Sequence, residues 1–160
     1  MYCIAMIDER YMREAIAAAR RGIAAGQTPF GTCIVRDGRV IATAHNAVWA
    51  DTDITAHAEI VAIRAACKAL RTVDLTGCDI YSTCEPCPMC FAAIHWARID
   101  RIVFGARIAD ARAAGFHELT LSNEQMKTLG GSEVQIVGDL LREENRQLFL
   151  DWIAQGGKPY

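Results

Sequence analysis

The chain has 160 residues and a net charge of −2, and its acidic and basic residues alternate in short mixed runs. A chain of this length is most simply one domain, residues 1–160, that buries about two thirds of the surface exposed when it is unfolded. The sequence shows no basic face, which argues against a nucleic-acid partner held by phosphate contacts. No segment approaches the length of a membrane span, and residues 1–6 contain no basic region ahead of an apolar run. We therefore expect a cytoplasmic protein without a membrane partner.

The chain contains seven cysteines and no secretion signal, which argues against a disulfide framework. An odd count leaves one thiol unpaired, and the cytosol keeps thiols reduced. Four of the cysteines stand apart in apolar surroundings and are predicted to be small buried hydrophobes without a chemical role. These four are Cys3, Cys33, Cys67 and Cys78.

The first elements predicted along the chain are a helix and a hairpin. Asp8 is the expected N-cap of a helix that ends at about Ala25, because apolar side chains recur there at helical spacing. Strands are predicted over 30–35 and 39–44. The Asp-Gly pair at 37–38 joins them, since this dipeptide readily adopts the positive φ angles of tight hairpin turns.

The rest of the chain alternates helices and strands. The predicted elements are a helix over about 56–70, a strand over 79–83, a helix from Pro88 to about Arg98 capped by Cys87, a strand over 101–105, mixed short helix and loop over 106–132, a strand over 134–137, and a terminal helix opened by Asp139. A strand, a helix and a strand in succession predict a crossover with parallel strands. The pattern therefore indicates an α/β fold.

Two short segments carry candidate metal ligands. His57 and Glu59 fall at the start of one predicted helix, and Cys87 and Cys90 at the start of the next. Zinc prefers four tetrahedral nitrogen or sulfur ligands, and a catalytic site leaves one position for water. We predict that His57, Cys87 and Cys90 bind the ion and that Glu59 moves protons between water and substrate. The N–H groups of the two helix starts also favour thiolates.

Helical spacing alone does not bring His57 and Glu59 to one ion, because they are about 200° apart on an ideal helix. Two other uses of the cysteines remain open at this point. Cys87 and Cys90 could form a redox pair at a helix start, although this leaves the His-Ala-Glu segment unexplained. Cys84 could complete a structural zinc site, although Glu59 suits a catalytic role better.

The two segments resemble the zinc-binding signature of cytidine and nucleobase deaminases. The likeness rests on residues 55–59 and 83–90 and extends from about 26 to 116. Within that family the chain looks most like bacterial guanine deaminases. The pointers are Trp96, the Ala-Gly-Phe run at 114–116 and the aromatic last residue, Tyr160.

The resemblance implies a three-layer α/β/α cytidine-deaminase-like fold around a central five-stranded mixed sheet, with one Zn²⁺ per subunit between the starts of the second and third helices. It also implies a homodimer. In guanine deaminases of this type the C-terminal segment, here about 139–160, is exchanged so that the partner's last residue helps to close each pocket. That residue would be Tyr160, although a frayed tail is the ordinary expectation for a chain end.

The resemblance also implies roles for single residues. Glu59 is the first catalytic carboxylate, and Glu118 matches the position of a second acidic proton carrier, with a solvated loop carboxylate as the alternative. The residues expected to bind the base are Phe30, Asn46, the backbone of Ala58, Trp96, Phe116 and Tyr160. Asn46 would donate and accept hydrogen bonds, and Phe30 would offer a stacking surface. Trp96 and Phe116 could instead be core aromatics.

The expected reaction is hydrolytic deamination of guanine to xanthine and ammonia. Isocytosine, cytosine, an amino-triazine or guanosine are alternative substrates on similar scaffolds. A tRNA adenosine deaminase is a further alternative, but it should carry a basic C-terminal helix, whereas acidic residues stand among the arginines of 139–155. A zinc-stabilised binding module without turnover is the non-enzyme alternative.

Overall fold

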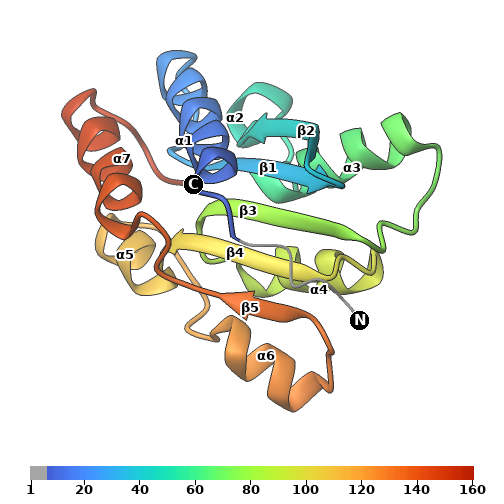
Figure 1. The fold of residues 1–160 in the computed structure, drawn as a ribbon. Helices are drawn as coiled ribbons and strands as arrows, with labels where there is room; N and C mark the ends of the chain where they lie inside the picture. The colour runs from blue at the N-terminus through green and yellow to red at the C-terminus, as the bar shows by residue number, and fades with distance from the viewer. Residues whose placement is uncertain (1–6) are drawn as a thin grey trace.

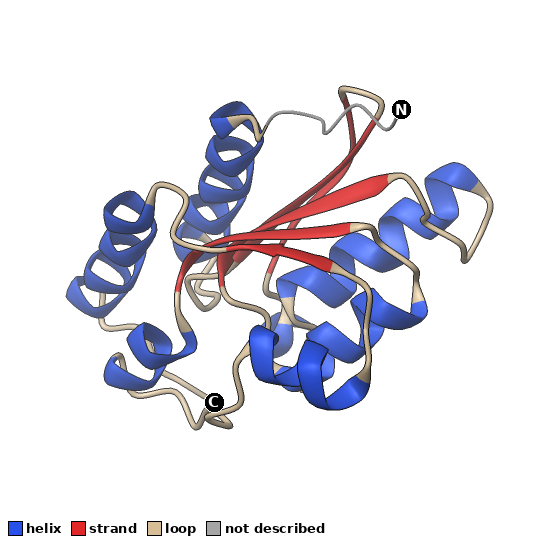
Figure 2. Cartoon of the chain, turned by 60° about the horizontal axis from the view of Figure 1, so that its bottom comes forward, coloured by secondary structure: helices blue, strands red, loops and turns tan. Residues whose placement is uncertain are grey.

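The computed structural model describes residues 7–160, so the prediction for Cys3 lies outside the described residues. A five-stranded sheet forms the centre, with helices on both of its faces (Figures 1 and 2). The strands are β1 (Gly31–Arg36), β2 (Arg39–His45), β3 (Cys78–Cys84), β4 (Arg101–Ala106) and β5 (Gln135–Val137). The helices are α1 (Glu9–Ala24), α2 (Val48–Asp51), α3 (Ala58–Leu70), α4 (Pro88–Trp96), α5 (Ile108–Ala113), α6 (Asn123–Gly130) and α7 (Arg142–Ala154).

The sheet is mixed and has the strand order β2-β1-β3-β4-β5. Strand β1 is antiparallel to β2 and β3, whereas β3, β4 and β5 are parallel. The predicted hairpin is confirmed, and Asp37 and Gly38 both have positive φ angles, of 50° and 72°. Helix α4 connects the parallel strands β3 and β4, as the crossover prediction requires. The three-layer α/β/α fold class is therefore confirmed.

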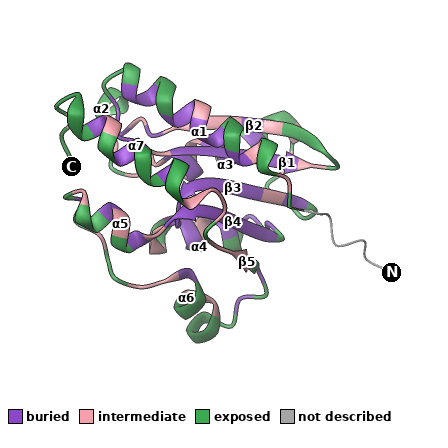
Figure 3. Ribbon diagram, turned by 60° about the vertical axis from the view of Figure 1, so that its left-hand side comes forward, coloured by how far each residue is buried: buried purple, intermediate pink, exposed green. Residues whose placement is uncertain are grey.

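Two hydrophobic cores lie on opposite faces of the sheet. Tyr81 and Val103 point into the core beneath α1 and α7, whereas Ile80 and Ile102 point into the core beneath α3 and α4. This alternation follows from the two-residue period of a strand, which sends successive side chains to opposite faces. Strands β3 and β4 are consequently buried on both sides (Figure 3). The ends of these rigid strands position the functional loops.

Several elements differ from the sequence prediction. The short helix α2 was not predicted, and the mixed region contains two defined helices, α5 and α6. The prediction that Asp139 opens the terminal helix is wrong, because α7 begins at Arg142. Asp139 has φ 65°, and its carboxylate accepts hydrogen bonds from Arg107 and Arg142 instead of capping the helix.

The isolated cysteines behave largely as expected of small apolar residues. Cys33 and Cys78 are buried, and Cys67 is partly exposed. Burial raises the pKa of the Cys33 thiol to about 12, so this thiol is neutral at physiological pH. Within residues 7–160, no helix has both the length and the apolar character needed to cross a membrane.

Candidate metal centre

The two segments that carry the predicted ligands meet at one end of the sheet. His57 is the N-cap of α3 and Cys87 is the N-cap of α4, with Pro88 at the first helical position as predicted. Both N-cap residues have extended backbone angles, and neither side chain makes a capping hydrogen bond. Both side chains are thus free to approach each other.

The helical-spacing problem for His57 and Glu59 is resolved by where α3 begins. The sequence predicted that the helix covers both residues, but it begins at Ala58, and His57 precedes it with ψ near 153°. The direction of the His57 side chain is therefore not set by the helical rotation of 100° per residue. Ala58 is fully buried. Its backbone N–H, like the other N–H groups of the first helical turn, has no acceptor within the helix.

The three predicted ligand atoms lie together. His57 Nδ1 is 3.6 Å from Cys87 Sγ and 3.5 Å from Cys90 Sγ, and all three donor atoms lie within 4.8 Å of one another. Zinc bonds of about 2.3 Å to sulfur and about 2.0 Å to nitrogen at tetrahedral angles give a sulfur–nitrogen separation of about 3.6 Å. The donor set therefore fits zinc, and three protein ligands leave a fourth position for water or substrate.

The alternative with Cys84 as a fourth ligand is not supported. The Cys84 thiol donates to the carbonyl oxygen of Arg107 at 3.6 Å, and among the described residues the donor group consists of His57, Cys87 and Cys90 alone. Cys87 and Cys90 are free thiols rather than a disulfide. The arrangement has the open position of a catalytic site and lacks the closed shell of a structural one.

The electrostatics of the donor group favour a thiolate at Cys87. Hydrogen bonds from Cys90 and His57 and the charge of His57 together lower the pKa of Cys87 to about 4, against the opposing effect of burial. The hydrogen bond with Cys87 and burial raise the pKa of Cys90. Burial alone would lower the pKa of His57, but the neighbouring Cys87 and Glu59 charges raise it overall. A divalent cation placed among these groups would hold both sulfurs as thiolates.

Glu59 lies beside the donor group in the first turn of α3. It is buried, and its Oε1 accepts a hydrogen bond of 2.9 Å from the Ser82 hydroxyl on β3. Its Oε2 is 3.5 Å from Cys90 Sγ. Burial raises the pKa of Glu59, whereas His57 and the Ser82 hydrogen bond lower it. Ser82 was missed in the sequence, where it could only be read as one polar residue in a buried strand.

Asn46 presents one side of its amide to the site. It is fully buried just after β2, and its Oδ1 accepts a hydrogen bond of 3.0 Å from the backbone N–H of Val48 at the start of α2. Its Nδ2 donates to the hydroxyl of Tyr160 at 2.9 Å. The orientation of the amide is thus determined by the short helix that the sequence did not reveal, and the group directed at the site is the N–H donor.

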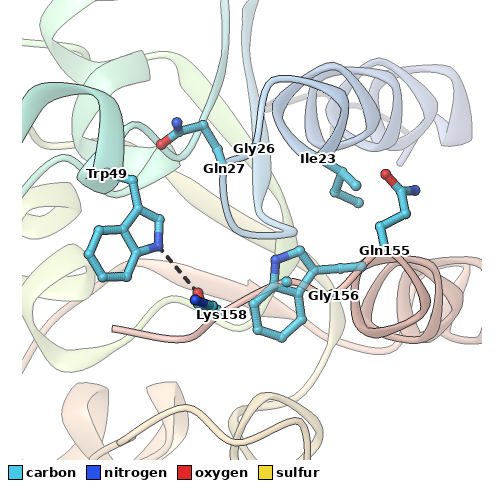
Figure 4. Close-up of a pocket in the computed structure, with 9 residues that line it drawn as sticks. Ile23, Gly26, Gln27, Trp49, Gln155, Gly156 and Lys158 are labelled. Atoms are coloured by element: carbon cyan, nitrogen blue, oxygen red, sulfur yellow. Dashed lines mark hydrogen bonds between the residues drawn. The ribbon is translucent and has the colours of Figure 1, made fainter.

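The C-terminal residue lies over the metal centre. The Tyr160 hydroxyl is 3.2 Å from His57 Nε2, the ring nitrogen opposite the one facing the sulfurs. The preceding tail is anchored by the indole of Trp49, which donates to the Lys158 carbonyl oxygen at 3.2 Å (Figure 4). A cavity of about 350 Å³ adjoins this anchor, but none of the metal donors lines it. This cavity is therefore distinct from the metal centre.

Aromatic side chains pack behind the tail. The Phe30 and Phe116 rings lie 4.9 Å apart, and Phe116 is 5.7 Å from the Tyr160 ring. Phe116 also stacks on Trp152 of α7 at 5.1 Å. Phe116 is buried and Phe30 is half-buried, so both contribute to the core as well as to the aromatic surface next to His57.

Trp96 does not join the other predicted site residues. It is the last residue of α4, whereas the ligands belong to the opposite end, and nine residues of helix separate the two ends by about 13 Å. Its side chain is 82% exposed and contacts the ring of His95. The prediction that Trp96 lines the pocket of its own chain is therefore corrected.

Glu118 lies on the loop between α5 and α6 and is half-buried. Burial and the negative charge of Cys87 raise its pKa, His57 lowers it, and the net result is a pKa of about 7. These influences place the carboxyl group within electrostatic range of the metal centre. At neutral pH such a group exists in both protonation states, as a proton carrier requires.

Comparisons with known proteins agree with this site. Residues 6–106 match the family described as the cytidine and deoxycytidylate deaminase zinc-binding region. A guanine deaminase of Bacillus subtilis is 44% identical over 120 residues, which are 74% of this chain and 77% of the relative. A tRNA-specific adenosine deaminase of the same organism is 39% identical over 137 residues, 86% of this chain and 83% of the relative.

The fold agrees as well. The solved structure of a guanine deaminase from Nitrosomonas europaea superimposes with a TM-score of 0.85 at 30% identity, covering 95% of this chain and 87% of the other. The zinc ligand set, the neighbouring Glu59 and strands β1 to β4 lie within the matched region, whereas β5 lies outside it. The chain belongs to the zinc-binding cytidine and deoxycytidylate deaminase family.

Proposed function

We propose that this deaminase acts on a free nucleobase, converting guanine and water to xanthine and ammonia. The observation that carries the proposal is the position of Tyr160, whose hydroxyl contacts both Asn46 and His57. A polynucleotide substrate needs an open path on both sides of the reacting base, whereas a free base needs only a small closed pocket. A site covered by the chain end favours the small substrate.

His57, Cys87 and Cys90 would hold the zinc ion, which when bound supplies an activated water for attack on the amine-bearing ring carbon. Glu59 accepts a proton from that water and delivers it to the adjacent ring nitrogen. Its raised pKa suits this exchange, because a carboxylate that is easily protonated both takes and returns a proton. Ser82 holds one carboxylate oxygen so that the other remains directed at the metal centre.

A second proton must reach the amine before ammonia can leave. We assign this step to Glu118, because its pKa of about 7 keeps part of the population protonated at neutral pH. The proton moves from the Glu118 carboxyl group to the amine nitrogen, the carbon–nitrogen bond breaks, and its electron pair leaves with ammonia. The hydroxyl on the ring carbon then gives its proton back to the Glu118 carboxylate as the carbonyl group of xanthine forms. Glu59 thus protonates the ring nitrogen and Glu118 protonates the amine, so one carboxyl group does not have to carry out both proton transfers.

Base recognition follows from the groups around the centre. The Asn46 Nδ2 would donate to a ring nitrogen or carbonyl acceptor once the base displaces or shares its contact with Tyr160. The backbone N–H of Ala58, at the start of α3, is a second donor. Phe30 and Phe116 offer aromatic surface for a planar ring.

A tRNA adenosine deaminase is the second candidate, favoured by the 39% identical relative. Phosphate binding by the C-terminal helix would require available cations. Helix α7 carries two arginines and three acidic residues, and both arginines are engaged. Arg142 pairs with Asp110 and Asp139, and Arg146 pairs with Asp110 and Glu143. These pairs weaken the case for a polynucleotide groove along α7.

Ammonia release from a substrate panel tests the proposal. The panel contains guanine, isocytosine, cytosine, ammeline, guanosine and an adenosine-containing tRNA stem-loop. We expect guanine to have the highest kcat/KM, activity to disappear after metal removal by a chelator, and zinc to restore it. Preference for the stem-loop would replace the free-base assignment, and a zinc-loaded protein that releases no ammonia from any member would refute an enzymatic role.

We also propose that the chain works in the cytoplasm as a homodimer in which segments 139–160 are exchanged. The contacts of Tyr160 with Asn46 and His57 support a functional role for the chain end. In an exchanged dimer the same contacts would be made by the second copy. The mixing experiment in the Discussion distinguishes the two arrangements.

A further inference from the structure

We propose that Glu85 is a positioning residue for the second proton carrier. In this inference, which rests on the role of Glu118 in the proposed function, Glu85 holds the starts of α5 and α6 against the metal-binding loop (residues 85–87). The loop 114–122, which carries Glu118, lies between these two helices. Glu85 lies two residues before the ligand Cys87, yet its side chain is not among the metal donors. The mechanism described above leaves this buried carboxylate without a task.

The Glu85 carboxylate bridges the starts of two helices. Its side chain is only 5% exposed. Oε2 accepts a hydrogen bond of 3.1 Å from the N–H of Ile108, the first residue of α5, and Oε1 accepts one of 2.9 Å from the N–H of Asn123, the first residue of α6. A carboxylate at a helix N-terminus is stabilised by the unpaired N–H groups and by the helix dipole. Two such termini hold one carboxylate here.

Backbone contacts make the bridge rigid. The Glu85 N–H donates to the Ala106 carbonyl oxygen at 2.8 Å, which joins the metal-binding loop to the end of β4. The fully buried Asn123 side chain donates through Nδ2 to the Pro86 carbonyl oxygen at 2.7 Å. The start of α6 is therefore bound to the peptide unit that immediately precedes Cys87.

These contacts define where Glu118 can lie. The segment from α5 to α6 leaves the sheet at Ile108 and returns at Asn123, and Glu85 binds both points. Glu118 stands on the loop between them, with Phe116 anchoring one side in the aromatic core. The distance from Glu118 to the reacting amine therefore depends on this bridge. A displacement of about 1 Å costs on the order of a hundredfold in rate.

A double-mutant cycle on the zinc-loaded protein tests the inference. Glu85→Gln preserves shape but places an amide N–H₂ opposite one of the two backbone donors. We expect it to lower kcat for guanine by about tenfold to a hundredfold, with little change in KM and unchanged zinc content. In the Glu118→Gln background, the same substitution should change kcat by less than about twofold, because the group it positions no longer carries a proton.

Two controls separate positioning from folding. Asp110→Asn disturbs another carboxylate in the first turn of α5. That carboxylate accepts from the Arg107 N–H and pairs with Arg142 and Arg146 of α7 instead of bridging to the start of α6, so the substitution should leave kcat unchanged. Glu85→Asp retains the charge but is too short to bridge, and should repeat the loss. Hydrogen exchange should quicken at residues 114–122 in both Glu85 variants.

The outcomes are distinguishable. If Glu118→Gln leaves kcat unchanged, the proton-carrier role fails and the inference fails with it. A second outcome is that Glu118→Gln lowers kcat and that adding Glu85→Gln to this variant lowers kcat again, by the same factor as in the wild-type protein. In that case the proposed function stands and the positioning role of Glu85 is refuted. Loss of zinc in proportion to activity would also overturn it, by assigning Glu85 to the metal-binding loop alone.

Discussion

The hydrogen bond from Ser82 to Glu59 should set the acidic limit of activity. Ser82→Ala removes the hydrogen bond of 2.9 Å that the serine hydroxyl donates to Oε1 of the buried Glu59 carboxylate. A hydrogen bond to a charged group contributes about 1.5–3 kcal/mol, and 1.36 kcal/mol corresponds to one pKa unit. Since this hydrogen bond lowers the pKa of Glu59, its loss should raise that pKa further above its ordinary value.

The free enzyme needs the ionised form of Glu59 to accept a proton from water. The acidic limb of the pH profile of kcat/KM should therefore move to higher pH in Ser82→Ala, whereas the plateau should change little. Steady-state ammonia release between pH 5 and 9 measures this. Thr32→Val is the matched control, because Thr32 lies opposite Ser82 on β1 and its buried hydroxyl makes no hydrogen bond among the described residues. A Ser82→Ala profile that superimposes on the wild type would refute the reasoning.

Three further outcomes are expected. Glu59→Gln should lower kcat by about 10²–10⁴-fold with zinc content unchanged by elemental analysis; loss of zinc would assign Glu59 to metal retention. Because burial raises the pKa of Glu118 from 4.5 to about 7, the folded protein holds a proton that the unfolded chain releases in that window, so wild-type stability should fall as pH rises from 5 to 8. In urea unfolding, the free energy of unfolding of Glu118→Gln should lack this decrease with pH. An equal pH dependence in the wild type and in Glu118→Gln would contradict the expectation. Finally, a chain lacking residues 158–160 should turn over substrate slowly. If the tails are exchanged, mixing this chain with Glu59→Gln should restore about a quarter of wild-type activity, because half of the random dimers are mixed and each mixed dimer has one complete site. No recovery would indicate that each tail covers its own site.

Local patterns were sufficient for the metal ligands and for most of the elements around them. Cys87 is the N-cap and Cys90 lies in the first turn of a helix that Pro88 begins, so a short local segment brings the two sulfurs together. The hairpin and the parallel crossover likewise depend on turn chemistry and strand order within short segments. The terminal helix begins later than predicted, because Asp139 pairs with the distant Arg107 and with Arg142, three residues ahead, instead of capping the helix.

The remaining site depends on contacts between distant parts of the chain. Tyr160 meets Asn46 across 114 residues, and α2 orients that amide; neither is encoded in a local pattern. Trp96 shares a helix with the ligands, yet the axial length of α4 carries it away from them. The sequence alone therefore determined which atoms could bind zinc, because they stand at two helix starts. Only the tertiary structure decided which side chains surround those atoms, because the packing of loops onto the ends of β3 and β4 brings them together.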